Sequence, residues 1–322
     1  MIEVKGLVKR YGEKTAVNGI SFSVKSGEIV GLLGLNGAGK STTMNCLTGY
    51  IAPSEGSITI DGHDIVADPM GARRIIGYLP EVFAFYPDMR VWEYLDYVCD
   101  LKGVTANKKE REEHIRTICE KVGVLPMAGR MIRNLSKGYK QRVGFAQALI
   151  GDPKVIILDE PTVGLDPSQI IDIRRLVKEA GKDSLVIVSS HILSEIQAIC
   201  SRVIVIHQGT VVADAAPDEL KKKFRSNDRL AVRIRGNAED VEKALRAIPD
   251  VADVVRLPQK ENGAEDFQIV GRRNKDIRES VFRTLAARDL PLLHTYGGEL
   301  SLEDVFLHLT GNDEKSGKGV AE

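Results

Sequence analysis

Two segments of the chain have the composition of phosphate-binding loops. The first, GLNGAGKST (34–42), follows the apolar run EIVGLLG (28–34) and precedes the helical pattern TTMNCLTG (42–49). It matches G-x-x-x-x-G-K-[ST], in which glycines let backbone N–H groups surround a phosphate and a helix N-terminus adds partial positive charge. The flanking strand and helix raise the match above a chance glycine-rich turn. The sequence therefore predicts a nucleoside triphosphate site.

The residue types of this loop have separate tasks. The amine of Lys40 can reach the β- and γ-phosphates, and the hydroxyl of Ser41 can ligate Mg²⁺. The residues expected to bind the nucleotide are Gly34, Asn36, Gly37, Ala38, Gly39, Lys40, Ser41 and Thr42.

An acidic pair, Asp159 and Glu160, ends the apolar run KVIILDE (154–160). Asp159 can hold Mg²⁺, and Glu160 can accept a proton from an attacking water. Alone, such a pair is typical of a helix N-cap or an acidic turn, but beside a phosphate loop it favours hydrolysis. His191 follows the apolar run SLVIVSS and is expected in the same crevice, where it can hydrogen-bond the γ-phosphate or orient the water.

The second loop-like segment is LSKGYKQRVG (135–144). It places Ser136, Lys137 and Gly138 at the start of an expected helix, whose N-terminus attracts anions. The residues alone leave open whether this segment binds the same nucleotide as the first loop.

The elements that must position these motifs are those of an α/β protein. Apolar runs at 28–34, 154–160, 184–190 and 202–209 are typical of buried strands, and amphipathic segments such as 168–181 lie between them. This alternation predicts a mainly parallel sheet with helices on both faces. The first 28 residues instead alternate apolar with polar side chains, which indicates an antiparallel sheet with one face in water.

Two further parts are expected outside this sheet. Residues 88–150 have mostly helical patterns and are expected to form an inserted helical subdomain. After about residue 225 the order strand, helix, strand, strand, helix, strand is similar to a ferredoxin-like unit. The expected segments are 229–236, 237–249, 250–258, 265–271, 274–289 and 290–299, followed by a closing helix at 301–311.

The expected domains are a nucleotide-binding domain (1–225), an accessory domain (226–311) and a flexible tail (312–322). The accessory domain has two open interpretations. It makes dimer contacts or gates the nucleotide-binding domain, or it only stabilises the chain.

The bulk composition is that of a soluble globular protein. Its 45 basic and 45 acidic residues cancel, which disfavours a dedicated nucleic-acid binder, and the basic runs 221–225 and 272–275 are interpreted as solvated faces. No apolar stretch approaches the length that spans a bilayer, and the start lacks a signal peptide. The scattered cysteines are expected to be free thiols in a reducing cytosol; they are Cys46, Cys99, Cys119 and Cys200.

Taken together, these motifs resemble the ATP-binding cassette (ABC) family, the ATPase subunits of ABC transporters, over residues 1–225. The matching segments are GLNGAGKST for the Walker A loop, VIILDE for Walker B, LSKGY for the LSGGQ signature, GLD (164–166) for the D-loop and SSH for the switch histidine. The resemblance implies that Glu160 and His191 are catalytic, that Tyr11 stacks on adenine, and that Asp166 belongs to the nucleotide site.

The family's head-to-tail dimer gives the second loop a role. In such a dimer the signature helix of one chain closes over ATP bound by the Walker A loop of the other. The resemblance therefore implies that Ser136, Lys137 and Gly138 contact the ATP of a second copy of this chain, so that one chain carries two half-sites. It also implies hydrolysis of ATP to ADP and phosphate.

Three positions, in two segments, depart from the family pattern. The signature has Lys137 where glycine is usual and Tyr139 where glutamine is usual. Lys137 either points toward the phosphates or faces solvent. Glu81, in GYLPE, stands where the family generally has glutamine. An ionised glutamate can only accept hydrogen bonds, and Glu81 is a candidate ligand of the metal or of its water.

The chain most resembles the ATPases of ABC-2-type exporters of the gliding-motility and multidrug-resistance types, whose permease is usually a separate polypeptide. This implies attachment to the cytoplasmic face of the cell membrane through a permease, and no nucleic-acid partner. Four aromatic residues are expected either to dock the permease or to pack the subdomain; they are Phe83, Phe85, Tyr86 and Trp92.

Two alternative functions are weaker. A soluble family member of translation or DNA repair would usually carry two cassettes or long coiled coils, and this sequence has one cassette and no sustained heptads. A non-hydrolysing regulatory module would not need the catalytic set; here Lys40, Asp159, Glu160 and His191 are intact.

Overall fold

The computed structural model describes residues 1–105, 107–223, 229–257, 261, 263–272 and 275–296. It divides into two compact units, Met1–Pro217 and Asp218–Glu322. The expected closing helix (301–311) and tail (312–322) lie outside the described residues, as do parts of the basic runs and the end of the strand expected at 290–299.

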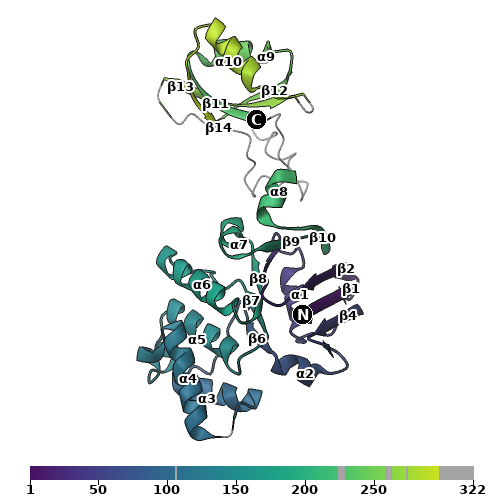
Figure 1. Cartoon of the computed structure of the whole chain (residues 1–322), viewed down its shortest axis with the longest axis vertical. Helices are drawn as coiled ribbons and strands as arrows, with labels where there is room; N and C mark the ends of the chain where they lie inside the picture. Colours follow the sequence, from purple (N-terminus) through teal and green to yellow (C-terminus); the bar gives the residue numbers. More distant parts are fainter. Residues whose placement is uncertain (106, 224–228, 258–260, 262, 273–274, 297–322) are drawn as a thin grey trace. The chain divides into compact units, whose positions relative to one another are not determined.

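The first unit is built on a six-stranded sheet of order β10-β9-β3-β8-β7-β6 (Figure 1). Its strands are β3 (Ile29–Leu33), β6 (Ile76–Leu79), β7 (Val155–Asp159), β8 (Leu185–Ser190), β9 (Arg202–His207) and β10 (Thr210–Ala215). All neighbours are parallel except β10, which is antiparallel to β9. The four apolar runs form β3, β7, β8 and β9, so the predicted parallel sheet is confirmed.

A second, antiparallel sheet has the order β2-β1-β4-β5. Its strands are β1 (Ile2–Tyr11), β2 (Lys14–Val24), β4 (Glu55–Ile60) and β5 (His63–Asp64). In β2, Val17, Ile20, Phe22 and Val24 are buried and the residues between them are mostly exposed, so the predicted antiparallel sheet with one wet face is also confirmed.

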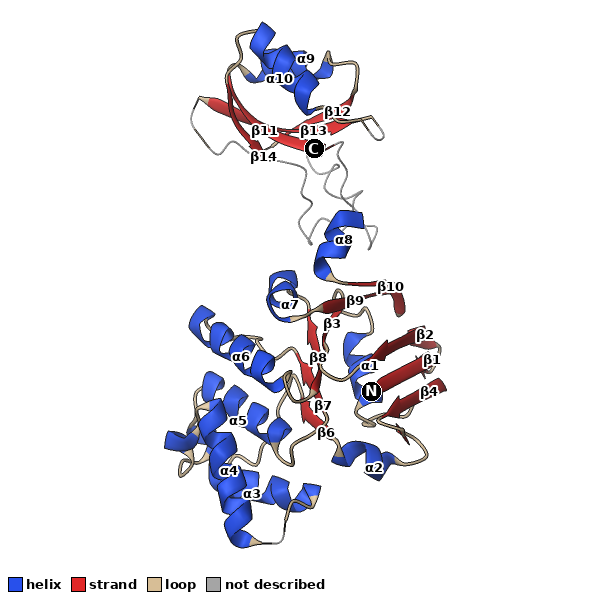
Figure 2. Cartoon of the chain, viewed as in Figure 1, coloured by secondary structure: helices blue, strands red, loops and turns tan. Residues whose placement is uncertain are grey.

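The helices of the first unit lie on both sides of the six-stranded sheet. Figure 2 shows α1 between the two sheets and α3, α4, α5 and α6 on the other side. These helices are α1 (Lys40–Leu47), α2 (Pro69–Arg74), α3 (Val91–Lys102), α4 (Lys108–Val122), α5 (Lys137–Leu149), α6 (Pro167–Ala180) and α7 (Leu193–Ile199), with short 3-10 turns at Leu125–Met127 and Ile132–Asn134. A further helix, α8 (Pro217–Lys223), begins at the boundary with the second unit. The core between the sheets includes Ile2, Leu7, Met44 and Leu47, all fully buried.

The contact between β6 and α5 is unusually close. A Cβ placed on Gly77 would stand 1.9 Å from the carbonyl oxygen of Ala148 in α5 and 2.9 Å from Pro153 Cγ. Only glycine allows this approach. Gly77 therefore sets how closely the C-terminal end of α5 packs on β6.

We expect Gly77→Ala to lower the free energy of unfolding by about 1–3 kcal/mol, because the added methyl overpacks a backbone contact. Chemical denaturation of the purified chain measures this change. Gly129→Ala is the matched control, because a Cβ there meets nothing within 4 Å. Equal stability of the Gly77 and Gly129 variants would contradict the expectation.

The second unit contains one antiparallel sheet of order β12-β13-β11-β14. Its elements are β11 (Arg229–Arg235), α9 (Ala238–Arg246), β12 (Val251–Arg256), β13 (Ala264–Gly271), α10 (Arg278–Ala287) and β14 (Leu292–Tyr296). A separate core includes Val232, Leu245, Phe267 and Ile269. Up to residue 296 the order of elements is the one predicted from the sequence.

Within the described part of the chain, none of the helices combines the length and apolar character that crossing a membrane requires.

Candidate nucleotide site

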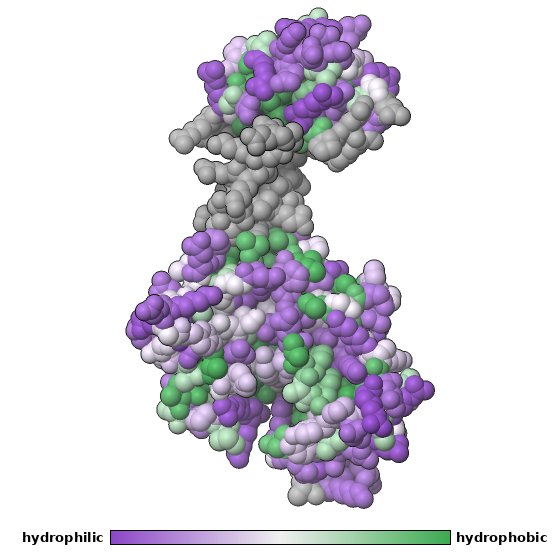
Figure 3. Space-filling view, turned by 180° about the vertical axis from the view of Figure 1, so that it is seen from behind, coloured by the Kyte–Doolittle hydropathy of each residue, from purple (hydrophilic) through white to green (hydrophobic). Residues whose placement is uncertain are grey.

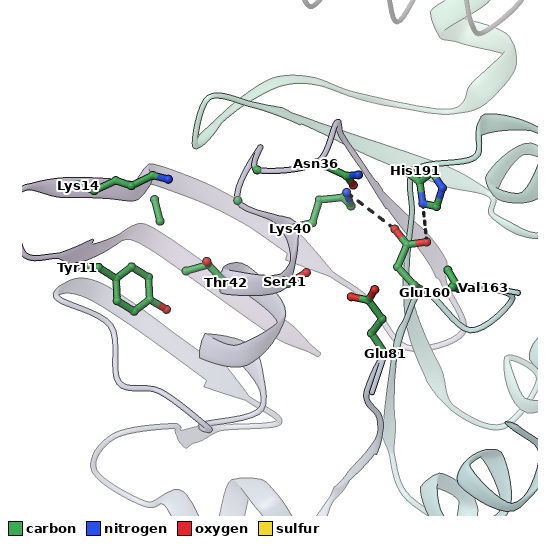
Figure 4. A pocket seen from close by; sticks show the side chains of 13 residues that line it. Tyr11, Lys14, Asn36, Lys40, Ser41, Thr42, Glu81, Glu160, Val163 and His191 are labelled. Carbon is green, nitrogen blue, oxygen red and sulfur yellow. Dashed lines mark hydrogen bonds and ion pairs between the residues drawn. The ribbon is translucent and has the colours of Figure 1, made fainter. Parts of the chain in front are cut away.

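The carboxyl ends of the parallel strands and the N-terminus of α1 enclose a cavity of about 370 Å³ (Figure 4). Its walls come from β1, β2, the loop after β3, the segment after β6 and the ends of β7 and β8. The lining residues are Tyr11, Lys14, Ala16, Asn36, Gly37, Gly39, Lys40, Ser41, Thr42, Glu81, Glu160, Val163 and His191. Residues distant in the sequence thus meet at the edge where ligands bind open α/β sheets.

The loop between β3 and α1 depends on glycine at two close approaches. Gly39, the N-cap of α1, has φ 110°, and a Cβ on it would stand 2.7 Å from the carbonyl oxygen of Ala16. A Cβ on Gly34 would stand 2.5 Å from the carbonyl oxygen of Ile206. Both contacts press the loop against neighbouring strands, which directs its N–H groups and the start of α1 toward the cavity. Ala38 is buried inside the loop.

Lys40 is the central cation of the cavity. Its side chain is only 6% exposed, and Nζ donates a hydrogen bond of 2.8 Å to the carbonyl oxygen of Gly34. Nζ also lies 3.9 Å from Glu160 Oε1. Burial lowers the pKa of the Lys40 amine, and the negative charge of Glu160 is the largest effect opposing that fall of the pKa. Lys40 is therefore held beside a carboxylate, in a position to exchange that partner for a phosphate.

Glu160 lies between a cation and an imidazole. Figure 4 shows its carboxylate between Lys40 and His191, and Oε2 is 2.9 Å from His191 Nδ1. Its backbone adopts the left-handed region, with φ 46°, and its N–H donates a 2.9 Å hydrogen bond to Ser189 Oγ. The carboxylate is 7% exposed. A buried carboxylate next to a histidine, at the mouth of a phosphate loop, has the arrangement of a general base.

Asp159 lies behind the lining residues at the end of β7. It is buried and accepts a short hydrogen bond from the hydroxyl of Ser189. Burial raises the pKa of the Asp159 carboxyl, while the Ser189 hydrogen bond opposes that rise of the pKa. The one hydroxyl of Ser189 thus fixes both acidic residues, because it also accepts from the N–H of Glu160.

Ser41 and Glu81 offer oxygen atoms to a cation in the same cavity. Figure 4 shows the Glu81 carboxylate between Ser41 and Glu160. Hydroxyl and carboxylate oxygens are the donors that Mg²⁺ prefers, and this ion usually takes one or two protein ligands together with phosphates and waters. Within the described residues, no group of three or more His, Cys, Asp or Glu side chains is close enough to hold a metal.

Tyr11 stands at the opposite wall of the cavity and is about half exposed. The amine of Lys9 lies 5.3 Å from the centre of its ring, a distance at which a cation–π contact forms. Lys14 and Ala16, on the next strand, also line the cavity, and Val163 lines it on the side of Glu160 (Figure 4). Sequence reasoning missed these three residues. The hairpin that joins Tyr11 to Lys14 is the signal that could have indicated Lys14.

The signature segment forms the N-terminus of α5, outside the lining of this cavity. Ser136 caps the helix by accepting from the N–H of Tyr139 at 3.5 Å. Lys137 does not reach the cavity lining; a Cβ on Gly164 would stand 1.9 Å from its Nζ, so the amine lies over that glycine. Gly138 is buried against Gln169. Lys137 therefore lies against the chain's own D-loop.

Asp166 caps α6, where its carboxylate accepts from the N–H of Gln169 at 2.9 Å and from Ser168 Oγ at 2.7 Å. It does not belong to the cavity lining among the described residues. The structure thus separates two sets of predicted site residues. The phosphate loop, Glu81, Glu160 and His191 come together, whereas Ser136 and Asp166 begin two helices elsewhere.

Known proteins are similar to this chain over nearly its whole length. The family model described as "ABC transporter" matches residues 17–163. The "Linearmycin resistance ATP-binding protein LnrL" of Bacillus subtilis (strain 168) is 33% identical, over 97% of this chain and 98% of its own length. The "Bacitracin transport ATP-binding protein BcrA" of Bacillus licheniformis is 32% identical, over 97% of both chains.

Solved structures match the cassette. One described as "Structure of ATP binding subunit of ABC transporter" has a TM-score of 0.64 and 31% identity, and covers 70% of this chain and 93% of that one. The dimeric cassette MJ0796 in a post-hydrolysis state with ADP and Pi has a TM-score of 0.62 and 26% identity, covering 67% of this chain and 98% of that one.

Proposed function

The chain belongs to the ABC transporter family as an ATP-binding subunit that hydrolyses ATP to energise export, and we propose that it works as a head-to-tail homodimer attached to a separate membrane permease. The observation that supports a dimer is the separation of the two phosphate-binding segments, residues 34–42 and 135–144. Lys40 and Glu160 line the cavity, while the N-terminus of α5 lies outside it. A second copy supplies the missing half of each site.

In this proposal ATP lies along the cavity from Tyr11 to His191. The adenine stacks on Tyr11, the phosphates take the loop N–H groups and Lys40, and the γ-phosphate faces Glu160. Ser136 and the first turn of α5 from the partner subunit close over that phosphate, with Lys137 and Gly138 in the same turn. In the closed dimer the γ-phosphate of ATP makes contacts that ADP cannot make. ATP therefore binds the closed dimer more tightly than the open form, and hydrolysis removes this preference.

The residues present fit Mg²⁺ as the cofactor. Ser41 and Asp159 are its proposed protein ligands, Asp159 through water, and Glu81 is a further ligand. When bound, the ion neutralises charge on the phosphates. Glu160 accepts the proton of the attacking water, and His191 orients that water or donates to the γ-phosphate. The hydrogen bond between His191 and Glu160 holds the base ready for this step.

For the second unit we propose a ferredoxin-like fold over residues 226–311. The support is the element order together with the strand order β12-β13-β11-β14, in which the two central strands are the first and third of the unit. Its proposed limits, after a nucleotide-binding domain of residues 1–225, can be checked in an experimental structure of the whole chain.

The proposed permease site is a groove between β6 and α3, which we call the tyrosine groove. A hollow of about 330 Å³ is lined by Ile76, Tyr78, Ala84, Tyr86, Tyr94, Tyr97, Val98, Leu101, Lys102 and Gln147. Seen from behind, the lower part of the cassette is notched and hydrophobic residues border the notch (Figure 3). An apolar groove of this kind suits an amphipathic helix of a partner.

The four aromatic residues expected at a docking site have different positions. Phe83 and Phe85 stack with ring centres 4.7 Å apart and are half-buried. A Cβ on Gly144 of α5 would stand 2.3 Å from the Phe83 ring, so this ring packs on the signature helix. Tyr86 is half exposed and lines the tyrosine groove, whereas Trp92 does not. We therefore assign docking to Tyr86 and packing to the two phenylalanines.

We expect Leu101→Asp to abolish recovery of the chain with membranes that contain its permease, because a charge replaces apolar surface in the tyrosine groove. Co-purification with a tagged permease measures this. Ile171→Asp is the matched control, since Leu101 is 66% and Ile171 64% exposed and Ile171 lies outside the groove. Both variants should keep the ATPase activity of the free chain. Normal recovery of the Leu101 variant would place the permease elsewhere.

A further inference from the structure

The segment Glu160–Asp166, which we call the base loop, is held by side chains from helices on two sides. It carries Glu160 at its start and the cap of α6 at its end. Within it, the N–H of Val163 donates to the carbonyl oxygen of Glu160 at 3.2 Å, and the N–H of Leu165 donates to that of Thr162 at 3.2 Å. Such tight turns leave other backbone groups of the loop to bond with side chains.

The first of these side chains is Gln141 of the signature helix. Its Nε2 donates a 2.5 Å hydrogen bond to the carbonyl oxygen of Pro161, the residue directly after Glu160. Gln141 is only 4% exposed, and Pro161 is buried as well. Both groups are buried, so water cannot take the place of either hydrogen-bond partner. The bond therefore fixes the backbone next to the base.

Other contacts hold the rest of the base loop. The hydroxyl of Thr162 and the hydroxyl of Ser190 both donate to the buried carboxylate of Glu195 on α7, which ties the loop to the strand end that carries His191. Further along, Lys137 lies over Gly164. Among these contacts, the one from Gln141 is made to Pro161, the residue that directly follows Glu160.

We infer that Gln141 is a positioning residue for hydrolysis, which holds the carboxylate of Glu160 of its own chain at the attacking water. This inference rests on the proposed function of the site. Helix α5 then serves two nucleotides. Its N-terminus, at Ser136, contacts the ATP of the partner subunit, and Gln141, one turn later, positions the base for the chain's own ATP.

The position of Gln141 explains why its loss should lower the rate of hydrolysis and not the affinity for ATP. Gln141 is not part of the cavity lining, whereas Lys40 and the loop that contact the nucleotide are. The base must lie within hydrogen-bond distance of the water, and a displacement of about 1 Å costs about 100-fold in rate. Loss of the amide leaves the carbonyl of Pro161 without this donor and frees the Pro161–Thr162 peptide, one residue after Glu160.

We therefore expect Gln141→Met in the full chain to lower kcat for ATP by about 10–100-fold, with KM within about threefold of the parent. Arg142→Met is the matched control, because Arg142 also donates from α5 to a backbone carbonyl, that of Val122, at 2.8 Å. It should lower stability and leave kcat unchanged. Parent-level kcat in Gln141→Met would overturn the inference. Should that variant not fold, Gln141→Asn, whose amide falls short of Pro161, carries the same expectation.

A mixing experiment separates positioning of the base from shaping of the signature helix. A Ser136→Arg chain and a Lys40→Ala chain together form a dimer with one intact composite site, whose Lys40 and Glu160 come from the Ser136→Arg chain. Adding Gln141→Met to that chain should lower the activity of the mixture about 10–100-fold, and adding it to the Lys40→Ala chain should leave the activity unchanged.

The reverse result, loss only with the substitution on the Lys40→Ala chain, would overturn the inference, because Gln141 would then act through Ser136. Failure of the proposed function has a different signature. In that case the mixture is inactive before any change at Gln141 is made.

Discussion

Glu160→Gln is expected to bind ATP, to hydrolyse it about 10²–10⁴-fold more slowly than the parent, and to accumulate as a dimer in the presence of ATP. The amide keeps the size of the side chain but cannot accept a proton from water. It also removes a negative charge 3.9 Å from Lys40 Nζ, so the lysine loses a competitor to the γ-phosphate. Binding is therefore preserved or improved while the chemical step is lost.

Phosphate release and gel filtration measure the two halves of this expectation. The matched control is Glu81→Gln, which makes the same change of carboxylate to amide in the same cavity and restores the residue that the family generally has there. It should retain hydrolysis. If Glu160→Gln turned over at the parent rate while Glu81→Gln did not, the base would be Glu81.

The parts of the site that the sequence predicts are those fixed by neighbours in the chain. A phosphate loop needs only a strand, a glycine turn and a helix in sequence, so Gly34 to Thr42 could be located from the pattern. The pair Asp159 and Glu160 follows in the same way from the end of a buried strand. Long apolar runs likewise fixed the parallel sheet, because each strand is buried on both faces.

Contacts between distant segments could not be predicted in this way. The carbonyl of Pro161, just after β7, accepts from Gln141 of α5, which lies 20 residues earlier in the chain. The C-terminal end of the same helix packs on Gly77 of β6, a third element. Lys14 enters the cavity through the register of the β1–β2 hairpin, which pairs Tyr11 with Lys14 and contains bulges that the alternating pattern does not reveal. The position of Lys137 over Gly164 is another such contact.

Two predicted site residues, Ser136 and Asp166, can each be interpreted either as a helix N-cap or as a nucleotide contact. Each caps a helix in the isolated chain, through bonds to Tyr139 N and Gln169 N. Serine and aspartate are among the preferred N-caps, so the caps alone need no nucleotide. Their role toward ATP has to be tested where a second chain is present.

A mixture of Ser136→Arg and Lys40→Ala chains is such a test, and we expect it to regain ATPase activity that neither chain has alone. Random pairing gives heterodimers in about half of the dimers, each with one intact site out of two, so the mixture should reach about a quarter of the parent activity. Lys40→Ala removes the phosphate-binding amine. Ser136→Arg places a large side chain where the partner's γ-phosphate would lie.

The Ser136 substitution suits this test because it leaves the chain folded. The cap bond it removes is long, at 3.5 Å, and the residue is exposed, so the loss of stability should be at most about 1 kcal/mol. A double variant with both substitutions in one chain, mixed with the Lys40→Ala chain, is the control, since no site in that mixture contains Lys40. Activity of the first mixture and not of the second means that one site draws residues from two chains. If neither mixture is active while both single variants fold and bind each other, the signature segment does not complete the site of its partner.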